Sequence, residues 1–345
     1  MDFLLDPGVT FLNHGSYGAC PAPVFARYQE LQRKLERNPV EFLARRFDAL
    51  TAESRAALAV YLGARPDDLV FVPNATAGLN AVIRSLRLDP GDEVLTTRHE
   101  YGAVTRTWEF MGASLVYADP EELVAAIGPR TREVSVSHIT SPTALVLPVA
   151  EICAAAREAG ALAIVDGAHA PGQLPLDLEA LGADVYAGNC HKWLCAPKGA
   201  GFLWARPEHQ RWIEPLVISW GYGADRTFAD RHGWQGTRDP AAVLTLPAAI
   251  EAHAVLDLER CRLLAASFHD LLPPCGPTPA PQMWATEVAT DEPEELQRRL
   301  FEEHAIEVVV REWEGRSLLR VSIAPYNDEA DVEQLLDALA WLTPA

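Results

Sequence analysis

The chain has 345 residues, a length at which a single hydrophobic core stops growing, so we expect one large domain, a smaller one and ample room for a cofactor. Apolar residues make up 49% of it, and a formal net charge of -19 favours solubility and repels the phosphates of nucleic acids. The composition therefore predicts a globular protein and excludes nucleic acid as a partner.

No segment indicates secretion or a membrane span. The N-terminal stretch MDFLLDPGVT lacks a basic region and a long apolar core, and no stretch approaches about 18 uninterrupted apolar residues. The six cysteines show no spacing that is typical of a disulfide framework or a zinc site. We expect a cytoplasmic location, reduced thiols, no metal and no membrane partner.

Between residues 69 and 205, short apolar runs alternate with amphipathic stretches. Strands are predicted at 69–73, 92–97, 113–118, 133–139, 161–166, 183–189 and 201–205. Helices are predicted between them at 74–88, 101–112, 148–160 and 176–182. This alternation is typical of βαβ units and predicts an α/β fold with a sheet of largely parallel strands.

The C-terminal third of the chain has a different pattern. A helical stretch is predicted over 242–272, and the proline-rich segment 273–282 marks a break or an exposed linker. The residues that follow are typical of a smaller α+β unit. We therefore assign 15–240 to a large domain that binds a cofactor, and 1–14 with 241–345 to a small domain.

Two chemically suggestive residues follow predicted strands. Asp166 ends the strand at 161–166, and Lys192 comes just after the strand at 183–189. Open parallel sheets bind ligands at the carboxyl ends of their strands, so both residues lie where a site is expected. By themselves they could equally form an ordinary ion pair.

The start of the helix predicted at 74–88 is a candidate anion site. Thr76 and the free backbone N–H groups of a helix N-terminus suit a phosphate group. The segment lacks the glycine patterns of nucleotide and dinucleotide sites. In the alternative reading, Asn74 or Thr76 only caps the helix.

Lysine is rare in this chain. It occurs only as Lys34, Lys192 and Lys198, and two of the three lie within 189–201. Arginine is too basic to form an imine, whereas a lysine with a lowered pKa can do so. Such a lysine, a carboxylate and a phosphate site are together what pyridoxal phosphate (PLP) needs. Lys198 remains the alternative imine-forming lysine.

Eight motifs give the chain a family resemblance. They are FLNHGSYGACPAPV, NATAGLNAVIRSL, HEYGAV, SHITSPTALVLPV, VDGAHAPGQ, AGNCHKWLCAPKGAGFLW, WQGTRDP and RVSIAPYN. In this order they resemble the class V aminotransferase family of PLP fold type I, and within it the isopenicillin N epimerase-like branch. The resemblance implies a large domain with a mainly parallel seven-stranded sheet between helices, a smaller α+β domain, PLP as cofactor and a homodimer with shared active sites.

The resemblance also implies catalytic roles. Lys192 matches the Schiff-base lysine, and Asp166 matches the residue that pairs with the pyridine nitrogen. His169 matches the position that hydrogen-bonds the ring oxygen of the cofactor. Tyr101 falls where related enzymes stack a histidine on the cofactor ring, and its phenol offers the same flat face.

Further positions match binding residues of the family. Thr76, Ala77 and His191 match phosphate-binding positions. Thr237 matches a residue that reaches the phosphate of the cofactor in the neighbouring subunit.

The resemblance also implies substrate contacts. Arg320 matches the arginine that grips the substrate's α-carboxylate, a task that its planar fork suits. Asn13 and His14 are candidate substrate-lining residues, although His14 could equally be a core histidine.

The implied function is that of a PLP-dependent enzyme acting at the α-carbon of an L-amino acid, with epimerisation or racemisation first. C–S lysis and transamination use the same residues and stay open, and a catalytically idle binding protein of the same fold is a further alternative. Cysteine desulfurases of the family carry a cysteine shortly before the arginine, but here no cysteine follows Cys275. Sulfur relay through a persulfide is therefore not expected.

Overall fold

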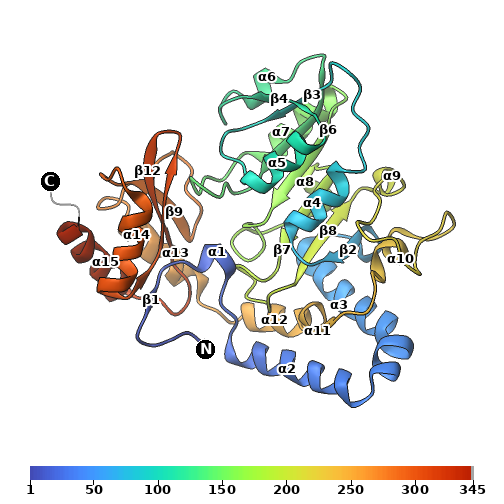
Figure 1. Ribbon diagram of the computed structural model, residues 1–345, viewed down its shortest axis with the longest axis horizontal. Coiled ribbons are helices and arrows are strands. Elements are labelled where there is room, and N and C mark those ends of the chain that lie inside the picture. Colours follow the sequence, from blue (N-terminus) through green and yellow to red (C-terminus); the bar gives the residue numbers. More distant parts are fainter. Residues whose placement is uncertain (343–345) are drawn as a thin grey trace.

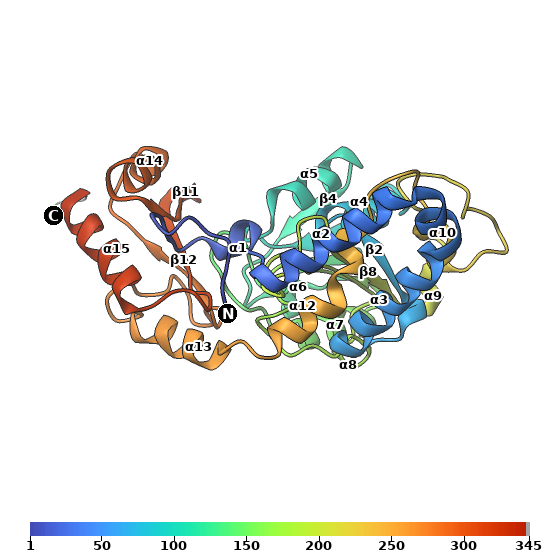
Figure 2. The same ribbon diagram turned by 90° about the horizontal axis from the view of Figure 1, so that it is seen from below.

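The computed structural model describes residues 1–342 as two lobes, with helix α1 (His14–Tyr17) between them (Figures 1 and 2). The other helices are α2 (Ala22–Arg37), the π-helix η1 (Glu41–Arg46), α3 (Phe47–Leu62), the short η2 (Pro66–Asp68), α4 (Ala75–Ile83), α5 (Gly102–Phe110), α6 (Leu123–Ala126), α7 (Val149–Glu158), α8 (Leu178–Leu181), α9 (Pro207–Gln210), α10 (Phe228–Gly233), α11 (Ala241–Leu244), α12 (Leu246–His253), α13 (Leu258–Ser267), α14 (Pro293–His304) and α15 (Glu329–Leu342). The strands are β1 (Thr10–Phe11), β2 (Leu69–Val72), β3 (Glu93–Thr96), β4 (Ser114–Tyr117), β5 (Thr131–Ser137), β6 (Leu162–Gly167), β7 (Val185–Asn189), β8 (Gly201–Ala205), β9 (Met283–Glu287), β10 (Ile306–Glu307), β11 (Val309–Trp313) and β12 (Arg316–Ser322).

The large lobe is built on a seven-stranded sheet with the strand order β2-β8-β7-β6-β5-β3-β4. Strands β3 to β7 pair in parallel, and β8 runs antiparallel to β7 and to β2. The mainly parallel sheet and the α/β class predicted from the sequence are thus confirmed. The parallel pairing brings the carboxyl ends of β5, β6 and β7 to one edge.

Alternate residues of the strands supply two hydrophobic layers, because successive side chains point to opposite faces of a sheet. In β6, Ala163 and Val165 belong to the layer that includes α2, α3, α7 and α12, whereas Ile164 belongs to the layer under α4, α5 and α10. The central strands β6 and β7 are buried on both faces, as the continuous apolar runs in their sequence predict. Trp108 of α5 is one of the largest fully buried side chains.

The small lobe contains an antiparallel sheet in the order β11-β12-β9 and a parallel pair formed by β1 and β10. Helices α13, α14 and α15 pack on it around Trp284 and Leu319, and Leu12 from the N-terminal segment joins the same core. The N-terminal residues thus pack with the C-terminal ones, and the assignment of residues 1–14 with 241–345 to one small domain stays a prediction.

The helix expected over 242–272 is three helices, α11, α12 and α13. Pro247 stands in the first turn of α12, where its missing N–H is tolerated, and Asp257 caps α13 by accepting the Arg260 N–H. Buried residues of α11 and α12 belong to the core of the large lobe. The domain boundary at residue 241 stays a prediction, and this packing favours a position nearer to Asp257.

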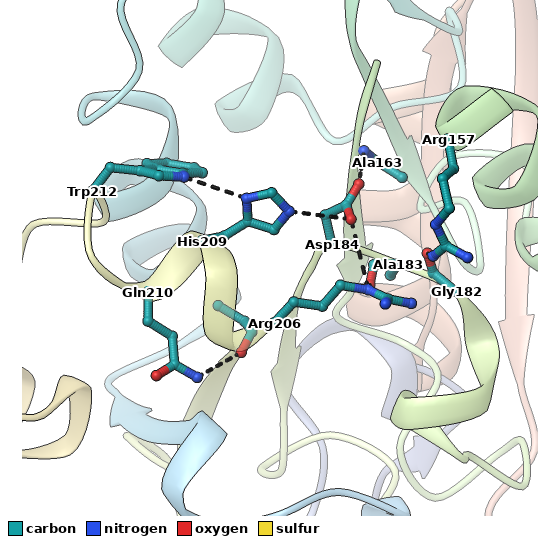
Figure 3. A network of polar contacts seen from close by, with 10 residues as sticks. Arg157, Ala163, Gly182, Ala183, Asp184, Arg206, His209, Gln210 and Trp212 are labelled. Carbon is teal, nitrogen blue, oxygen red and sulfur yellow. Dashed lines mark hydrogen bonds and ion pairs between the residues drawn. The ribbon is translucent and has the colours of Figure 1, made fainter. Parts of the chain in front are cut away.

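A polar network connects the strands at the edge of the large sheet opposite the carboxyl ends of β5, β6 and β7 (Figure 3). Asp184, directly before β7, accepts the Ala163 N–H at 2.8 Å, and it lies 3.3 Å from His209 and 3.6 Å from the Arg206 guanidinium. Arg206 also donates to the Ala183 carbonyl. Because these contacts join β6, β7 and β8 at the end opposite the carboxyl ends of the parallel strands, we assign them a purely structural role.

Within residues 1–342, no helix is both long and apolar enough to cross a membrane. The same described residues contain no group of three or more His, Cys, Asp or Glu side chains placed to hold a metal ion.

Candidate active site

A cavity of about 190 Å³ lies at the carboxyl ends of β5, β6 and β7. Six of the predicted cofactor-binding and catalytic residues line it together: Thr76, Tyr101, Asp166, His169, His191 and Lys192. Sequence reasoning missed Ser16, Tyr17, Ser137, Ser141 and Asn189, which also line it. Their only sequence signal was their place in the quoted motifs, where serine and asparagine carry no distinctive spacing.

Lys192 is the central basic group of this cavity. It sits in the loop after β7, and its Nζ lies 3.1 Å from His169 Nε2. Burial, together with the nearby Arg320, lowers the pKa of Lys192 to about 7. At neutral pH a large fraction of the protein molecules therefore carry Lys192 as the uncharged amine, which is the form that acts as a nucleophile or a base.

The ring of His169 is fixed by its other neighbour. The indole Nε1–H of Trp193, which can only donate, points at His169 Nδ1 at 3.3 Å. In neutral His169 the proton is therefore on Nε2, facing Lys192. Burial and the charge of Lys192 hold the pKa of His169 well below its usual range, so the neutral ring is the relevant form.

Asp166 stands near the end of β6 and is buried, with Oδ1 accepting the Ala168 N–H at 2.9 Å. Burial raises the pKa of Asp166, and the Ala168 hydrogen bond and the Lys192 charge act in the opposite direction. A second buried acid, Glu100, accepts hydrogen bonds from Thr97 and Ser137. Burial raises the pKa of Glu100 to about 7.

The N-terminus of α4 forms one end of the cavity. Asn74 caps the helix by accepting the Ala77 N–H at 2.9 Å, and Asn189 of β7 accepts the Ala75 N–H at 2.8 Å. Of these first-turn amides, only that of Thr76 has no hydrogen-bond partner in the part of the chain that the structure describes. Thr76 also lines the cavity, whereas Ala77 does not. The Asn74 cap is therefore present, and it leaves the Thr76 amide free, so the anion site at this helix stays a prediction.

Arg320 of β12 is buried, with 3% of its surface exposed, and none of its partners is acidic. Its guanidinium donates to the carbonyl and hydroxyl oxygens of Ser141 and to the hydroxyl of Ser16, and its Nε has no hydrogen-bond partner among residues 1–342. Burial and Arg311 lower the pKa of Arg320 to about 9. A buried cation without an acid is costly, so this arrangement favours an anionic ligand next to Ser16 and Ser141.

Asn13 and His14 lie behind the cavity and do not line it. Asn13 Oδ1 accepts a hydrogen bond from the hydroxyl of Ser16, the same serine that Arg320 contacts. His14 Nε2 lies 3.0 Å from the Lys192 carbonyl oxygen. In this structure Asn13 orients Ser16 and His14 supports the lysine loop, so direct substrate contact by either stays a prediction.

Two other predicted positions lie elsewhere. Thr237 lines a separate, larger cavity of about 910 Å³, which contains none of the other predicted site residues. The role of Thr237 at the cofactor of the partner subunit in a homodimer stays a prediction. A sedimentation experiment in which the active enzyme is a monomer would contradict it. Lys198 Nζ donates to the Gly18 carbonyl at 2.9 Å and does not line the cavity of Lys192, which disfavours it as the reactive lysine.

Close backbone contacts keep the Lys192 loop in place. Gly18 has φ 70°, and a Cβ there would stand 2.0 Å from the His191 carbonyl oxygen. Gly172 has φ 97°, and its Cβ would stand 2.3 Å from the Trp193 carbonyl carbon. Only glycine is compatible with both the backbone conformation and the space at these two positions.

The donor set fits PLP. The cavity holds a lysine that is free to react, a buried carboxylate and a helix N-terminus with an unpartnered amide at Thr76. These match, in order, the covalent attachment point, a partner for a pyridine nitrogen and a phosphate site.

We expect Arg320→Lys to raise KM for an amino-acid substrate about 10–100-fold, because a point charge replaces a fork that can bind a carboxylate with two parallel hydrogen bonds. Cofactor affinity should change much less, since no cofactor-binding candidate contacts Arg320. Steady-state kinetics and cofactor titration measure the two effects. Equal weakening of both would place Arg320 outside the substrate site.

Comparison with known proteins places this geometry in a family. The family model for aminotransferase class-V matches residues 12–272. Isopenicillin N epimerase of Streptomyces clavuligerus is 38% identical over 99% of this chain and 96% of its own length. A probable chloroplastic L-cysteine desulfhydrase of Arabidopsis thaliana is 30% identical over 71% of this chain and 58% of its own length. Among solved structures, the cystine C–S lyase C-DES in complex with its product cysteine persulfide is similar in fold, with a TM-score of 0.84 at 24% identity, covering 97% of this chain and 98% of that one.

Proposed function

Because the chain belongs to the aminotransferase class-V family and is a PLP-dependent enzyme, we propose that it epimerises or racemises an L-amino acid at the α-carbon. The 38% identity to isopenicillin N epimerase, which extends over nearly the whole of both chains, supports this reaction. The similarity to an L-cysteine desulfhydrase and to a cystine C–S lyase supports C–S lysis equally. In the structure, the amine of Lys192 and the buried Arg320, which has no acidic partner among residues 1–342, support the part that all the candidate reactions share, chemistry at the α-carbon of an amino acid.

Three groups would hold the cofactor. Lys192 is the attachment point, Asp166 the partner of the pyridine nitrogen, and the Thr76 amide at the start of α4 a donor to the phosphate. When bound, PLP supplies an electron sink that makes the α-proton of an amino acid acidic.

Lys192 is then the base that removes the α-proton. Its lowered pKa keeps the amine free near neutral pH, and a base whose pKa is close to the working pH is the most effective. Neutral His169, whose Nε2 lies 3.1 Å from the amine, carries its proton on that nitrogen and so does not itself take the substrate proton.

Arg320 orients the substrate. Its guanidinium holds the α-carboxylate, with the Ser16 and Ser141 hydroxyls forming the rest of that subsite. Fixing the carboxylate aligns the α-proton with Lys192 and so contributes through proximity as well as binding.

C–S lysis is the second candidate, because an L-cysteine desulfhydrase and a cystine C–S lyase are among the similar proteins. A persulfide relay is not expected for this chain. All six thiols have raised pKa values, for which burial is the main cause, and none lines the cavity. Any sulfur product should therefore leave directly.

We expect the PLP-loaded enzyme, incubated in D₂O with a panel of L-amino acids that includes L-cysteine, to exchange the α-proton of one of them and invert its configuration without forming pyruvate. Mass spectrometry, chiral chromatography and a pyruvate assay measure the three outcomes. Pyruvate and sulfide without inversion would select the lyase. A Cys190→Ala, Cys195→Ala double variant should retain the activity. If the wild-type enzyme formed a cysteine persulfide, and the double variant lost both the persulfide and the activity, the persulfide relay would have to be accepted for this chain.

A further inference from the structure

Glu100, the residue directly before the N-cap of α5, is a buried acid without a cation to balance it. Its Oε1 accepts the Thr97 hydroxyl at 2.8 Å, and its Oε2 accepts the Ser137 hydroxyl at 2.6 Å. Within residues 1–342 it forms no ion pair, and 8% of its surface is exposed. Burying a carboxylate costs free energy unless it is both paired and hydrogen-bonded. The two hydroxyls meet the second condition and leave the first one open.

The two hydroxyls stand in different places. Thr97 does not line the cavity, and its oxygen also accepts the His99 N–H at 3.1 Å, so it anchors Glu100 to the loop after β3. Ser137, the last residue of β5, lines the cavity. Glu100 therefore lies behind the cavity wall and acts on the cavity through Ser137.

Ser137 is a direct neighbour of Asp166. The two residues are register partners in the parallel pair of β5 and β6, so their side chains share one face at the usual strand spacing of about 4.7–4.9 Å. Both line the cavity. Asp166 Oδ1 accepts the Ala168 N–H, whereas Oδ2 has no hydrogen-bond partner in the described part of the chain. Asp166 and Ser137 thus present oxygen atoms side by side to a ligand.

The bond to Glu100 decides what Ser137 can offer to that ligand. A serine hydroxyl has one proton to donate and two lone pairs that accept. Because the proton is directed at Glu100, the Ser137 oxygen faces the cavity as an acceptor, next to the Asp166 carboxylate. Two adjacent acceptors favour a ligand atom that carries a hydrogen and disfavour a bare lone pair. The negative charge of Glu100 behind them acts in the same direction.

The surrounding charges do not cancel this effect. Burial is the main reason why the pKa of Glu100 is raised to about 7, the two hydroxyl bonds lower it and Asp166 raises it, so Glu100 is mainly ionised above neutral pH. Tyr186, which also faces Asp166, stays neutral, because burial holds its pKa well above the usual range. Among the described residues, Lys192 is the cation that acts on Asp166, and its pKa of about 7 makes it mainly uncharged in the same pH range.

We propose that Glu100 is a positioning residue for the cofactor. By accepting the hydrogen bond of Ser137 and by placing a negative charge behind Asp166, it keeps the pyridine nitrogen of PLP protonated, the state in which the ring withdraws electrons best. The inference rests on the proposed role of Asp166 as the partner of that nitrogen. It does not depend on which reaction follows at the α-carbon of the substrate.

The protonation state of the nitrogen can be measured directly. The enzyme is loaded with PLP that carries ¹⁵N in the ring, and the ¹⁵N chemical shift is followed with pH by NMR. In Glu100→Gln, which is nearly isosteric, the nitrogen should lose its proton at a pH about one unit lower than in the wild type, a tenfold change in the protonation equilibrium. Ser137→Ala keeps the charge but removes the acceptor, so it should give a smaller shift in the same direction. Ser137→Thr keeps the hydroxyl and should stay near the wild type.

Glu133→Gln is the matched control. Glu133 is buried in the same strand as Ser137, with 4% of its surface exposed, and burial raises its pKa to about 7, but it does not line the cavity. This variant should leave the ¹⁵N titration unchanged.

Calorimetry on the cofactor-free protein gives a second readout. The wild type should bind PLP more tightly than an analogue in which a C–H group replaces the ring nitrogen. This preference should fall about 2–10-fold in Glu100→Gln and in Ser137→Ala, the range for one hydrogen bond, and should persist in Glu133→Gln.

An unchanged ¹⁵N titration in Glu100→Gln, or the same shift in Glu133→Gln, would overturn the role of Glu100. A shift in Glu100→Gln together with a wild-type titration in Ser137→Ala would overturn the part assigned to Ser137. Asp166→Asn separates the inference from its premise. A nitrogen whose titration this variant leaves unchanged would overturn the proposed role of Asp166, and this inference with it.

Discussion

Lys192→Ala is expected to slow α-proton exchange by about 10²–10⁴-fold, the usual contribution of a positioned base, and to abolish covalent attachment of the cofactor. The physical reason is that no other lysine is among the described residues that line the cavity. Lys198 donates a hydrogen bond to the Gly18 carbonyl outside it. Deuterium exchange followed by mass spectrometry measures the rate, and the loss of the visible absorbance of the bound cofactor measures the attachment.

The fold should survive this change, because the Nζ of Lys192 has a single polar contact, with His169. Lys198→Ala is the control variant and should keep both the absorbance and most of the exchange. An absorbance band that persists in Lys192→Ala and disappears in Lys198→Ala would reverse the two assignments.

Asp166→Asn is expected to leave the cofactor bound but to slow the reaction by about 10²–10³-fold, the range seen when one preorganised electrostatic group is removed. The amide is nearly isosteric and can still accept the Ala168 N–H, so the geometry is preserved. It carries no charge, however, and cannot keep a pyridine nitrogen protonated. Cofactor titration and single-turnover kinetics separate binding from chemistry.

The pH dependence of this variant has a definite sign. Asp166 raises the pKa of Lys192, although burial and Arg320 bring it down to about 7. Removing that negative charge should lower the pKa of Lys192 further, so the rise of the remaining activity with pH should move to lower pH. Glu100→Gln, which neutralises another buried acid with a pKa of about 7, should have a smaller effect on the rate. Near-normal turnover in Asp166→Asn would contradict the role of Asp166.

The sequence predicted the parts of the molecule that depend on local pattern. Apolar runs bounded by turns predicted each strand of the large sheet, and the ends of β6 and β7 predicted where Asp166 and Lys192 would meet. The break of the helix at 242–272 could also have been anticipated, because Pro247 cannot donate within a helix.

The rest of the site depends on contacts between segments far apart in the chain. The contact by which Trp193 fixes the His169 ring and the contacts of Arg320 with Ser16 and Ser141 both require the tertiary structure.

The most direct measurement is to incubate the cofactor-free protein with PLP, reduce it with borohydride and locate the label by peptide mass spectrometry. With three lysines in the chain, the result is unambiguous. We predict a label on Lys192 alone, incorporated faster at pH 8 than at pH 6, because the amine is free only above its pKa of about 7. A label on Lys198 or Lys34, or no label at either pH, would contradict the account.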